Sequence, residues 1–246
     1  MRLLQGFRST IFYIGLLPLT ALFAIISIPL WLLPLRLRHY VIMQWSHIVL
    51  WWLRGCCGVR WRIQGFDKLP DQPSVVMSKH QSAWETIAIG AFFPPQAWVI
   101  KKELLFIPLY GWALASIKPI AINRAQGASA IKQVLSESRK RLEAGFWVVI
   151  FPEGTRVAPG DKHPYARSAA TIAKDFNCPI VPVAHNAGVF WPRDTFIKRP
   201  GCIEMLIGDP VLPDQKSASE LTTQCEEWIE NNTDALVKNA AGAYPV

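Results

Sequence analysis

The sequence predicts an α/β fold in which helices flank a mostly parallel central sheet, preceded by an N-terminal apolar helical hairpin that serves as a membrane anchor. After residue 58, short apolar runs alternate with longer helical patterns, which favours a sheet with crossover helices. Residues 146–151 are apolar without polar alternation, as is typical of a strand buried on both faces. No charged residue occurs over residues 9–35, which exceeds the ~20 apolar residues that a helix needs to cross a bilayer.

The composition favours a membrane as a partner. Hydrophobic residues make up 51% and charged residues 18% of the 246 residues, and the formal net charge is +8. A basic balance suits nucleic acid, an anionic membrane surface or phosphorylated substrates, and the apolar content favours the membrane, so we expect no nucleic-acid partner. Five cysteines without a C-x-x-C spacing predict reduced thiols and no zinc site.

The first 55 residues are predicted to anchor the protein, and residues 56–246 to form a separate globular domain. The anchoring segment holds two apolar stretches, 9–35 and 40–53, with basic residues between them. We expect three prolines to kink or end its helices: Pro18, Pro29 and Pro34. One spanning helix followed by an interfacial helix, or a hairpin that enters a single leaflet, both fit this pattern. A buried hairpin in the core of a soluble protein is the alternative.

The globular domain is expected to begin with a strand at residues 59–63, where apolar and polar residues alternate. The apolar run 74–77, bounded by Pro73, predicts the next strand. The apolar run 86–93 predicts a helix, and residues 96–100 predict a further short strand.

The second half of the domain continues the alternation. Residues 104–115 are apolar but interrupted by a proline and a glycine, and residues 117–122 contain Pro119, which predicts a broken or edge strand. Residues 126–143 carry apolar side chains at helical spacing among charged ones, which predicts a surface helix before the buried strand. The remaining expected elements are a helix at 165–176, strands at 180–184 and 203–207, and a helix at 219–237.

A histidine stands between the strand at 74–77 and the helix that follows it. Glu85 lies five positions after His80, where its carboxylate could hold the imidazole in one tautomer and leave the far ring nitrogen as a general base. The same residues contain Ser82-x-x-Glu85, a capping box that needs no chemistry. Both interpretations remain open at this point.

A second polar group follows the buried strand, in the run Phe-Pro-Glu-Gly-Thr-Arg at residues 151–156. Gly154 and Thr155 can present backbone N–H groups and a hydroxyl, and Arg156 can bind a phosphate with two parallel hydrogen bonds. Arg124 follows another strand and is a second candidate phosphate ligand. Because ligands gather at the carboxyl ends of strands in open α/β sheets, we expect these groups and His80 along one edge.

Together these motifs resemble the glycerolipid acyltransferase family, whose hallmarks are H-x-x-x-x-D and F-P-E-G-T-R, and within it the bacterial 1-acylglycerol-3-phosphate acyltransferase branch. Three further blocks are similar: residues 120–124 ending in arginine, residues 181–184 with a proline, and a lysine segment at 101–104. The resemblance covers about residues 60 to 210 in the right order. Glu85 replaces the usual aspartate, as in related lipid A acyltransferases, which remain an alternative that the F-P-E-G-T-R block disfavours.

The resemblance implies a reaction. His80 takes the proton from the free hydroxyl of lysophosphatidic acid, Glu85 orients the imidazole, and the oxygen attacks the thioester of acyl-CoA or acyl-carrier protein without an acyl-enzyme. It implies no cofactor and no metal, and it implies that Glu153 orients the arginines or a glycerol hydroxyl. The implied substrate-binding residues are Lys101, Arg124, Glu153, Gly154, Thr155 and Arg156.

The expected location is a bacterial inner membrane, with the lipid bilayer as a partner and the catalytic domain on the cytoplasmic side. Two rival functions remain. Ser82 could be a nucleophile of a lipid hydrolase, although the chain has no G-x-S-x-G elbow. A non-catalytic, membrane-anchored lipid-binding or scaffold protein could keep the fold without the reaction. We expect His47, His163 and His185 to be structural or surface histidines, and His185 is the one worth testing because it follows the last apolar block.

Overall fold

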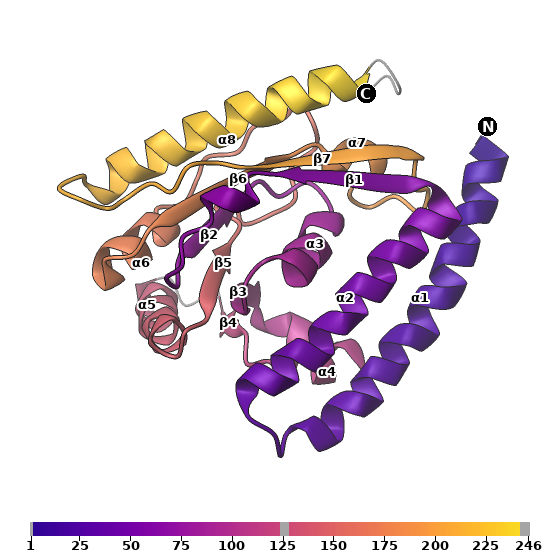
Figure 1. The fold of residues 1–246 in the computed structure, drawn as a ribbon, viewed down its shortest axis with the longest axis horizontal. Helices are drawn as coiled ribbons and strands as arrows, with labels where there is room; N and C mark the ends of the chain where they lie inside the picture. The colour runs from indigo at the N-terminus through magenta and orange to yellow at the C-terminus, as the bar shows by residue number, and fades with distance from the viewer. Residues whose placement is uncertain (1, 124–127, 242–246) are drawn as a thin grey trace.

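The computed structural model describes residues 2–123 and 128–241, whose strands form a seven-stranded sheet in the order β1-β7-β6-β2-β5-β3-β4 (Figure 1). The strands are β1 (Val59–Gln64), β2 (Val75–Ser78), β3 (Gln96–Lys101), β4 (Ile120–Ile122), β5 (Trp147–Ile150), β6 (Ile180–His185) and β7 (Gly201–Ile207). Neighbouring strands are parallel except β6 and β7, which pair antiparallel. The predicted mostly parallel sheet is therefore confirmed.

Burial along the strands follows their place in the sheet. Every residue of β2, β5 and β6 is buried, because helices cover both faces at the centre. Residues of β1 and β7 instead alternate between buried and more exposed positions, as in strands with one wet face. The short β4, which follows Pro119, lies at the opposite edge, so the predicted edge strand is confirmed.

Helices form a layer on each face of the sheet (Figure 1). One face packs against α5 (Ala128–Glu143), α6 (Ser168–Phe176) and α8 (Ala218–Ala241). The other packs against α1 (Arg2–Leu30), α2 (Leu35–Cys57), α3 (Trp84–Phe92), α4 (Tyr110–Ser116) and α7 (Ala187–Phe190). Successive residues of β2 belong to the two cores in turn: Val75 and Met77 lie in the core that contains α5, α6 and α8, while Val76 lies in the core of the opposite face.

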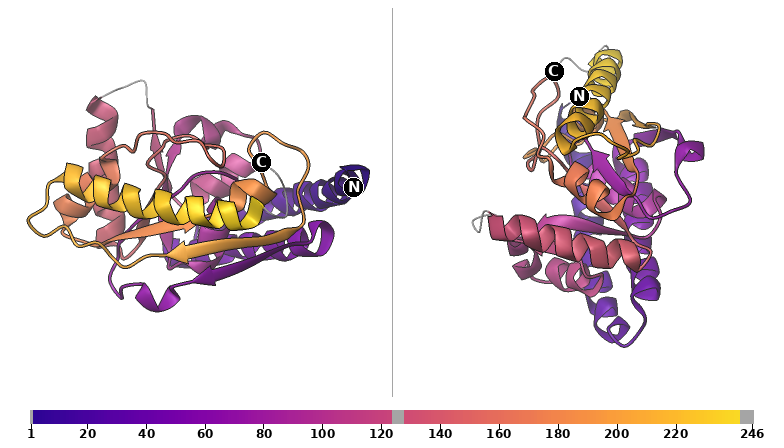
Figure 2. Two further views of the ribbon diagram at one scale, coloured as in Figure 1. Left: turned by 90° about the horizontal axis from the view of Figure 1, so that it is seen from above. Right: turned by 90° about the vertical axis from the view of Figure 1, so that its left-hand side faces the viewer.

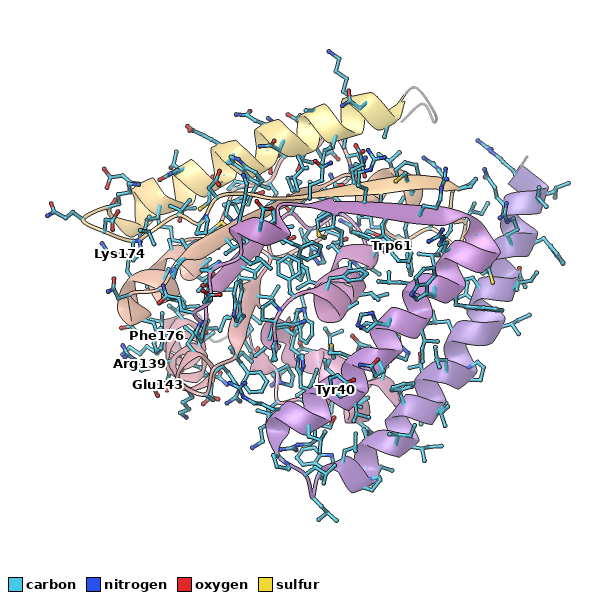
Figure 3. The ribbon with its side chains drawn as sticks, in the orientation of Figure 1. Tyr40, Trp61, Arg139, Glu143, Lys174 and Phe176 are labelled. Atoms are coloured by element: carbon cyan, nitrogen blue, oxygen red, sulfur yellow. The ribbon has the colours of Figure 1, made fainter. Side chains whose placement is uncertain are left out.

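The helix α5 shows how the amphipathic pattern is used. Val134 and Leu142 are buried against the sheet, whereas Arg139 and Glu143 are exposed on the far side of the helix (Figure 3). The predicted surface helix is confirmed. The apolar stretch at 104–115 is not one element, because it divides between the 3₁₀ helix η2 (Lys102–Phe106) and α4. A further 3₁₀ helix, η1 (Phe66–Lys68), follows β1.

The N-terminal hairpin consists of α1 and α2, which lie side by side beyond α3 and α4 (Figures 1 and 2). Pro18 does not end the first helix, because α1 continues through Pro18 and Pro29 and ends at Leu30. The expected kink at these prolines stays a prediction. Pro34 precedes α2, where a missing N–H costs nothing. The second helix is longer than its apolar stretch and ends at Cys57, and the division at residue 55 stays a prediction.

Among the described residues, α1 is the helix with the length and hydropathy to cross a membrane, and only 22% of its most apolar window is buried. Hydrogen bonds and ring contacts hold it to the globular domain. The buried Lys198 donates from Nζ to Tyr13 Oη at 2.6 Å and from its backbone N–H to Ser9 Oγ at 2.9 Å. Phe12 meets Trp191 edge to face at 5.5 Å. The rest of the α1 surface is largely apolar and exposed.

Candidate active site

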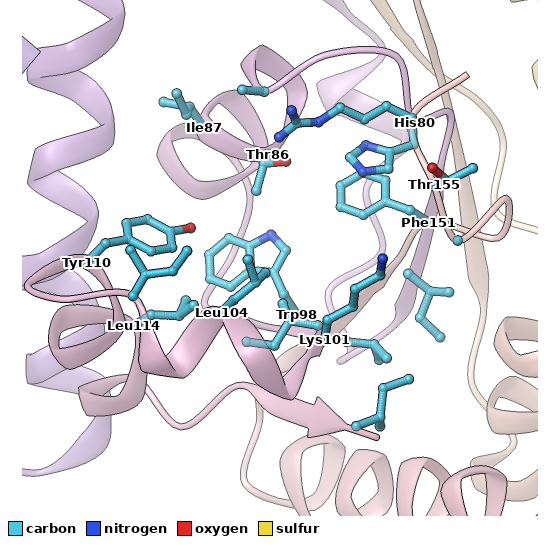
Figure 4. Close-up of a pocket in the computed structure, with 18 of the residues that line it drawn as sticks. His80, Thr86, Ile87, Trp98, Lys101, Leu104, Tyr110, Leu114, Phe151 and Thr155 are labelled. Carbon is cyan, nitrogen blue, oxygen red and sulfur yellow. The ribbon is translucent and has the colours of Figure 1, made fainter. Parts of the chain in front are cut away.

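The imidazole of His80 sits just beyond the carboxyl end of β2, before α3 begins. Its side chain is 17% exposed and stacks on the ring of Phe151, with the ring centroids 4.1 Å apart and an interplanar angle of 18°. Phe151 follows β5, the neighbour of β2 in the sheet. Both residues line a cavity, so one face of the imidazole is supported by an apolar ring and its edge reaches open space (Figure 4).

Glu85 is fully buried in the first turn of α3 and binds the imidazole. Its Oε1 lies 2.7 Å from His80 Nδ1 and accepts the backbone N–H groups of Gln81 at 3.0 Å and Ser82 at 2.9 Å. The two interpretations of the motif are therefore compatible, since one carboxylate oxygen supports both the helix start and the histidine.

Burial alone would raise the pKa of Glu85, but hydrogen bonds from His80 and from the backbone hold this pKa below its ordinary value. The carboxylate is therefore ionised and can only accept. Nδ1 of His80 must then carry its proton, which leaves Nε2 with a free lone pair on the cavity side.

Ser82 takes a structural part. It is fully buried, and its Oγ accepts the backbone N–H of Trp84 at 3.1 Å, the first residue of α3. Ala83, not Ser82, occupies the position directly before the helix. A hydroxyl engaged in this way suits a helix start and gives no support to the hydrolase alternative.

The loop after β5 wraps around His80. Gly154 has a φ of 67°, a conformation that favours glycine, and its N–H donates to the carbonyl of Phe151 at 3.0 Å. The backbone N–H of Val157 donates to the carbonyl of His80 at 2.7 Å, and His80 N–H donates to Glu153 Oε2 at 2.8 Å. Both polar backbone groups of His80 are thus held by the loop that follows β5.

The predicted substrate-binding residues converge on the same cavity, as the parallel strands require. The ones that line it are Lys101, Glu153, Gly154, Thr155 and Arg156. Thr155 is exposed and Arg156 half-buried at the polar end. Arg124 lies outside the described residues. That these groups bind substrate stays a prediction.

The Glu153 carboxylate contacts the first motif. Its Oε1 accepts from Lys79 Nζ at 2.7 Å, its Oε2 accepts from His80 N–H, and Lys79 Nζ also donates to Glu230 Oε1 at 2.7 Å. The expected role of Glu153 toward the arginines or a glycerol hydroxyl stays a prediction. Sequence reasoning missed Lys79 and Glu230. A lysine so close to the apolar run 75–77 was the available signal for the first, whereas no local pattern marks the second.

His185, at the end of β6, lies behind the pair. It is fully buried, its Nε2 donates to the carbonyl of Lys79 at 2.8 Å, and its Nδ1 accepts from Ala187 N–H at 3.3 Å. Burial lowers its pKa, so the ring is neutral. Its Nε2 is also 4.0 Å from Glu85 Oε2. These contacts fit the structural role expected for His185.

The cavity is large and mostly apolar, with a volume of about 1310 Å³. Trp98, Leu104, Tyr110 and Leu114 lie on one side of it, while His80 and Thr155 lie at its polar end (Figure 4). The hairpin helices also contribute walls, through Leu16, Leu17, Thr20, Ala21, Phe23, Ile42, Met43, Trp45 and Ser46. Within residues 2–123 and 128–241, no group of three or more His, Cys, Asp or Glu side chains is arranged to hold a metal ion.

Comparison with known proteins gives one consistent result. The family model described as Acyltransferase matches residues 60–186. The chain is 37% identical over 234 residues to a 1-acyl-sn-glycerol-3-phosphate acyltransferase of Pseudomonas aeruginosa, covering 93% of this chain and 91% of that protein. It is 30% identical over 162 residues to the human 1-acyl-sn-glycerol-3-phosphate acyltransferase alpha, covering 65% of this chain and 56% of the human protein.

Among solved structures, the 1-acyl-sn-glycerophosphate acyltransferase of Thermotoga maritima has a similar fold, with a TM-score of 0.79. The match covers 96% of this chain and 98% of that one, at 22% sequence identity. The likeness therefore extends through the N-terminal hairpin as well as the sheet.

Proposed function

The chain belongs to the acyltransferase family, and from this premise we propose that it transfers an acyl group from a thioester to the sn-2 hydroxyl of 1-acylglycerol 3-phosphate (lysophosphatidic acid), producing phosphatidic acid. The observation that carries the proposal is the His80–Glu85 pair, whose free imidazole nitrogen faces a large apolar cavity with cationic groups at its polar end. A base, an apolar chamber and phosphate ligands are what this reaction requires.

The chemistry begins at His80 Nε2, which accepts the proton of the acceptor hydroxyl as its oxygen attacks the thioester carbonyl carbon. The tetrahedral intermediate then collapses, the C–S bond breaks, and the imidazolium returns the proton to the departing thiolate. Ionised Glu85 stabilises the imidazolium through its 2.7 Å contact with Nδ1. General base catalysis of this kind contributes about 10²–10⁴-fold.

Acceptor binding falls to the polar end of the cavity. Arg156 can hold the phosphate with two parallel hydrogen bonds, and Lys101 adds a point charge from the end of β3. Thr155 and the backbone of Gly154 can add hydrogen bonds beside them. The sequence motif assigns Arg124 to the same phosphate. The donor is acyl-CoA or acyl-carrier protein, and the residues need no cofactor for this reaction.

The hairpin links the site to the lipid. Its helices expose apolar side chains outward and line the cavity inward, so a lipid chain can pass from a bilayer to His80 without crossing water. We place the protein on a bacterial inner membrane, with the acyltransferase domain on the cytoplasmic side, where acyl thioesters are made.

The test is incorporation of labelled acyl groups into lysophosphatidic acid by the purified full chain in detergent, beside His80→Ala. We expect the variant to lose at least roughly 10²-fold in kcat while remaining folded. His47→Ala is the matched control, because that ring packs edge-on against Phe92 and does not line the cavity. Activity that survives in His80→Ala would reduce Glu85 to a helix cap and end the proposal.

The same assay separates the rival functions. Turnover with another lysolipid or a lipid A-type acceptor, but not with lysophosphatidic acid, would move the chain to a different branch. Binding of lysophosphatidic acid without turnover of either donor would indicate a lipid-binding protein that keeps the fold alone.

A further inference from the structure

We propose that Lys79 is a positioning residue for this reaction: its ammonium holds the Glu153 carboxylate against the main chain of His80. Glu230 of α8 is the second anchor of that ammonium. The proposal rests on the proposed function, because the group positioned is the proposed base.

Lys79 is itself fixed at both of its backbone groups. Its N–H donates to the carbonyl of Val183 at 3.0 Å, and its carbonyl accepts from His185 Nε2 at 2.8 Å. Both partners belong to β6, the neighbour of β2. The lysine side chain therefore starts from a rigid point at the sheet edge.

From there the side chain crosses to the helical layer that contains α8. Lys79 Nζ is 2.7 Å from Glu153 Oε1 and 2.7 Å from Glu230 Oε1, and Tyr165 Oη donates to the same Glu230 oxygen at 2.7 Å. The side chains of Lys79, Glu153 and Glu230 are 1%, 0% and 9% exposed, so water does not compete for these hydrogen bonds.

The consequence for His80 follows from the two oxygens of Glu153. One oxygen accepts from the Lys79 ammonium, and the other accepts from His80 N–H. Because Lys79 holds the carboxylate in place, the carboxylate in turn holds the backbone of His80 in place. Burial raises the pKa of Glu153, and the ammonium of Lys79 opposes that rise. Without the lysine, the carboxyl would take up a proton more readily and turn away from His80.

Stability gives little reason for this arrangement. Replacing a buried ion cluster with apolar side chains is often neutral or stabilising, whereas removing one partner alone is costly. A lysine between two carboxylates at this point is therefore better explained by the direction it imposes on Glu153. A small displacement of a reacting group can cost roughly 10²-fold in rate.

The experiment compares Lys79→Met with the double variant Lys79→Met/Glu230→Gln in the full chain. The single variant leaves two buried carboxylates without a cation, and we expect a lower Tm and lower activity. The double variant removes one of these charges and keeps an acceptor for Tyr165, so part of the lost Tm should return. We expect kcat to stay roughly 10–100-fold below the parent value, with KM for lysophosphatidic acid changed less than about threefold.

Recovery of kcat together with Tm in the double variant would show that Lys79 only balances charge, and would overturn the proposal. Should Lys79→Met fail to fold, Glu230→Ala and Glu230→Gln give the same answer. Gln keeps the oxygen that Lys79 and Tyr165 use, so it should restore much of the kcat lost in Glu230→Ala. Equal kcat in Glu230→Ala and the parent would contradict the second anchor. Glu227→Ala, at an exposed position of α8, is the matched control.

A readout independent of turnover separates this proposal from the proposed function. The NMR chemical shift of the His80 backbone amide, assigned by its loss in His80→Ala, reports the hydrogen bond from His80 N–H to Glu153 in each variant. We expect this amide shift to change in the double variant and not in Glu227→Ala, whichever acceptor the protein uses. An unchanged amide shift would overturn the positioning role even in an active enzyme.

Discussion

Two regions of this protein place side chains where soluble proteins seldom put them. At the carboxyl edge of the sheet, Lys79, Glu85 and Glu153 are buried, although charged groups are rarely buried unless paired. In the hairpin, large apolar side chains of α1 are exposed along most of its length, among them Leu3, Phe7, Ile14, Leu17, Ile25 and Ile28. The first region buries charged side chains, and the second exposes apolar side chains.

The two regions differ in where their side chains find partners. Of the buried charges, Lys79 and Glu153 find their partners inside the chain, and Glu85 binds His80 and two backbone N–H groups. That closed network fixes geometry, which is what a general base needs. The exposed apolar face of α1 packs on no other element among the described residues. A lipid bilayer would cover this face and would bring the lipid substrate to the protein.

The largest effect should follow from Glu85→Gln, which tests the closed network. The amide oxygen can still accept the backbone N–H groups, but the negative charge that stabilises the imidazolium is lost. We expect kcat to fall roughly 10²–10⁴-fold with a smaller change in KM, measured by acyl transfer to lysophosphatidic acid.

Glu85→Asp is the matched control, because it keeps the charge and shortens the reach by one methylene group. It should retain more activity than Glu85→Gln. A Gln variant that matches the parent rate would mean that Glu85 serves only the start of α3.

The second largest effect should follow from Ile25→Lys/Ile28→Lys, which tests the exposed face. Both side chains are more than half exposed, at 59% and 56%, and neither lines the cavity. A lysine in the apolar part of a bilayer costs roughly 3 kcal/mol, so we expect the double variant to bind lipid vesicles about 100-fold more weakly. Co-sedimentation with the vesicles measures this binding. Activity on detergent-dispersed substrate should be nearly unchanged.

Leu212→Lys provides the control for this pair, since Leu212 is 49% exposed but lies outside the hairpin. It should bind vesicles as the parent does. Equal vesicle binding by the double lysine variant would show that α1 does not carry the membrane contact.

Sequence patterns predicted that the two motifs lie at one edge of the sheet, because each motif follows a strand with a clear apolar run. Parallel strands end at one edge, so the placement of His80 beside residues 151–156 followed from order alone. The ion cluster behind them was not predictable, because Glu230 lies 151 positions from Lys79 on another helix. Only the fold brings these two residues together.

The hairpin shows a different limit. Its apolar stretches were evident, but their ends were not, because Pro18 lies inside α1 without ending it. A proline removes one hydrogen bond from a helix, and packing against α2 and α4 outweighs that loss. The buried contact of Lys198 with Tyr13 was equally invisible, since it joins a loop to a helix 185 positions earlier.

The smallest effect concerns the joint between the two regions, where α2 packs on the sheet through His39. Its ring is 4% exposed, stacks near Trp98 and accepts the backbone N–H of Gln96 at 3.3 Å. Burial lowers the pKa of His39 to about 4, so the folded protein keeps this ring neutral while the unfolded chain takes up a proton below pH 6.5. Stability is therefore lost as pH falls from 6.5 toward 4, by roughly 2 kcal/mol between pH 7 and pH 5.

Chemical unfolding of the parent and of His39→Gln at both pH values measures this contribution as a difference. The difference is needed because the lowered pKa of His185 acts in the same direction. Gln keeps an acceptor for the N–H of Gln96 and does not titrate, so we expect the variant to lose less stability on acidification. An equal loss of stability in both proteins would mean that His39 can take up a proton in the folded state. The hairpin would then pack on the sheet less tightly than the buried contacts of His39 indicate.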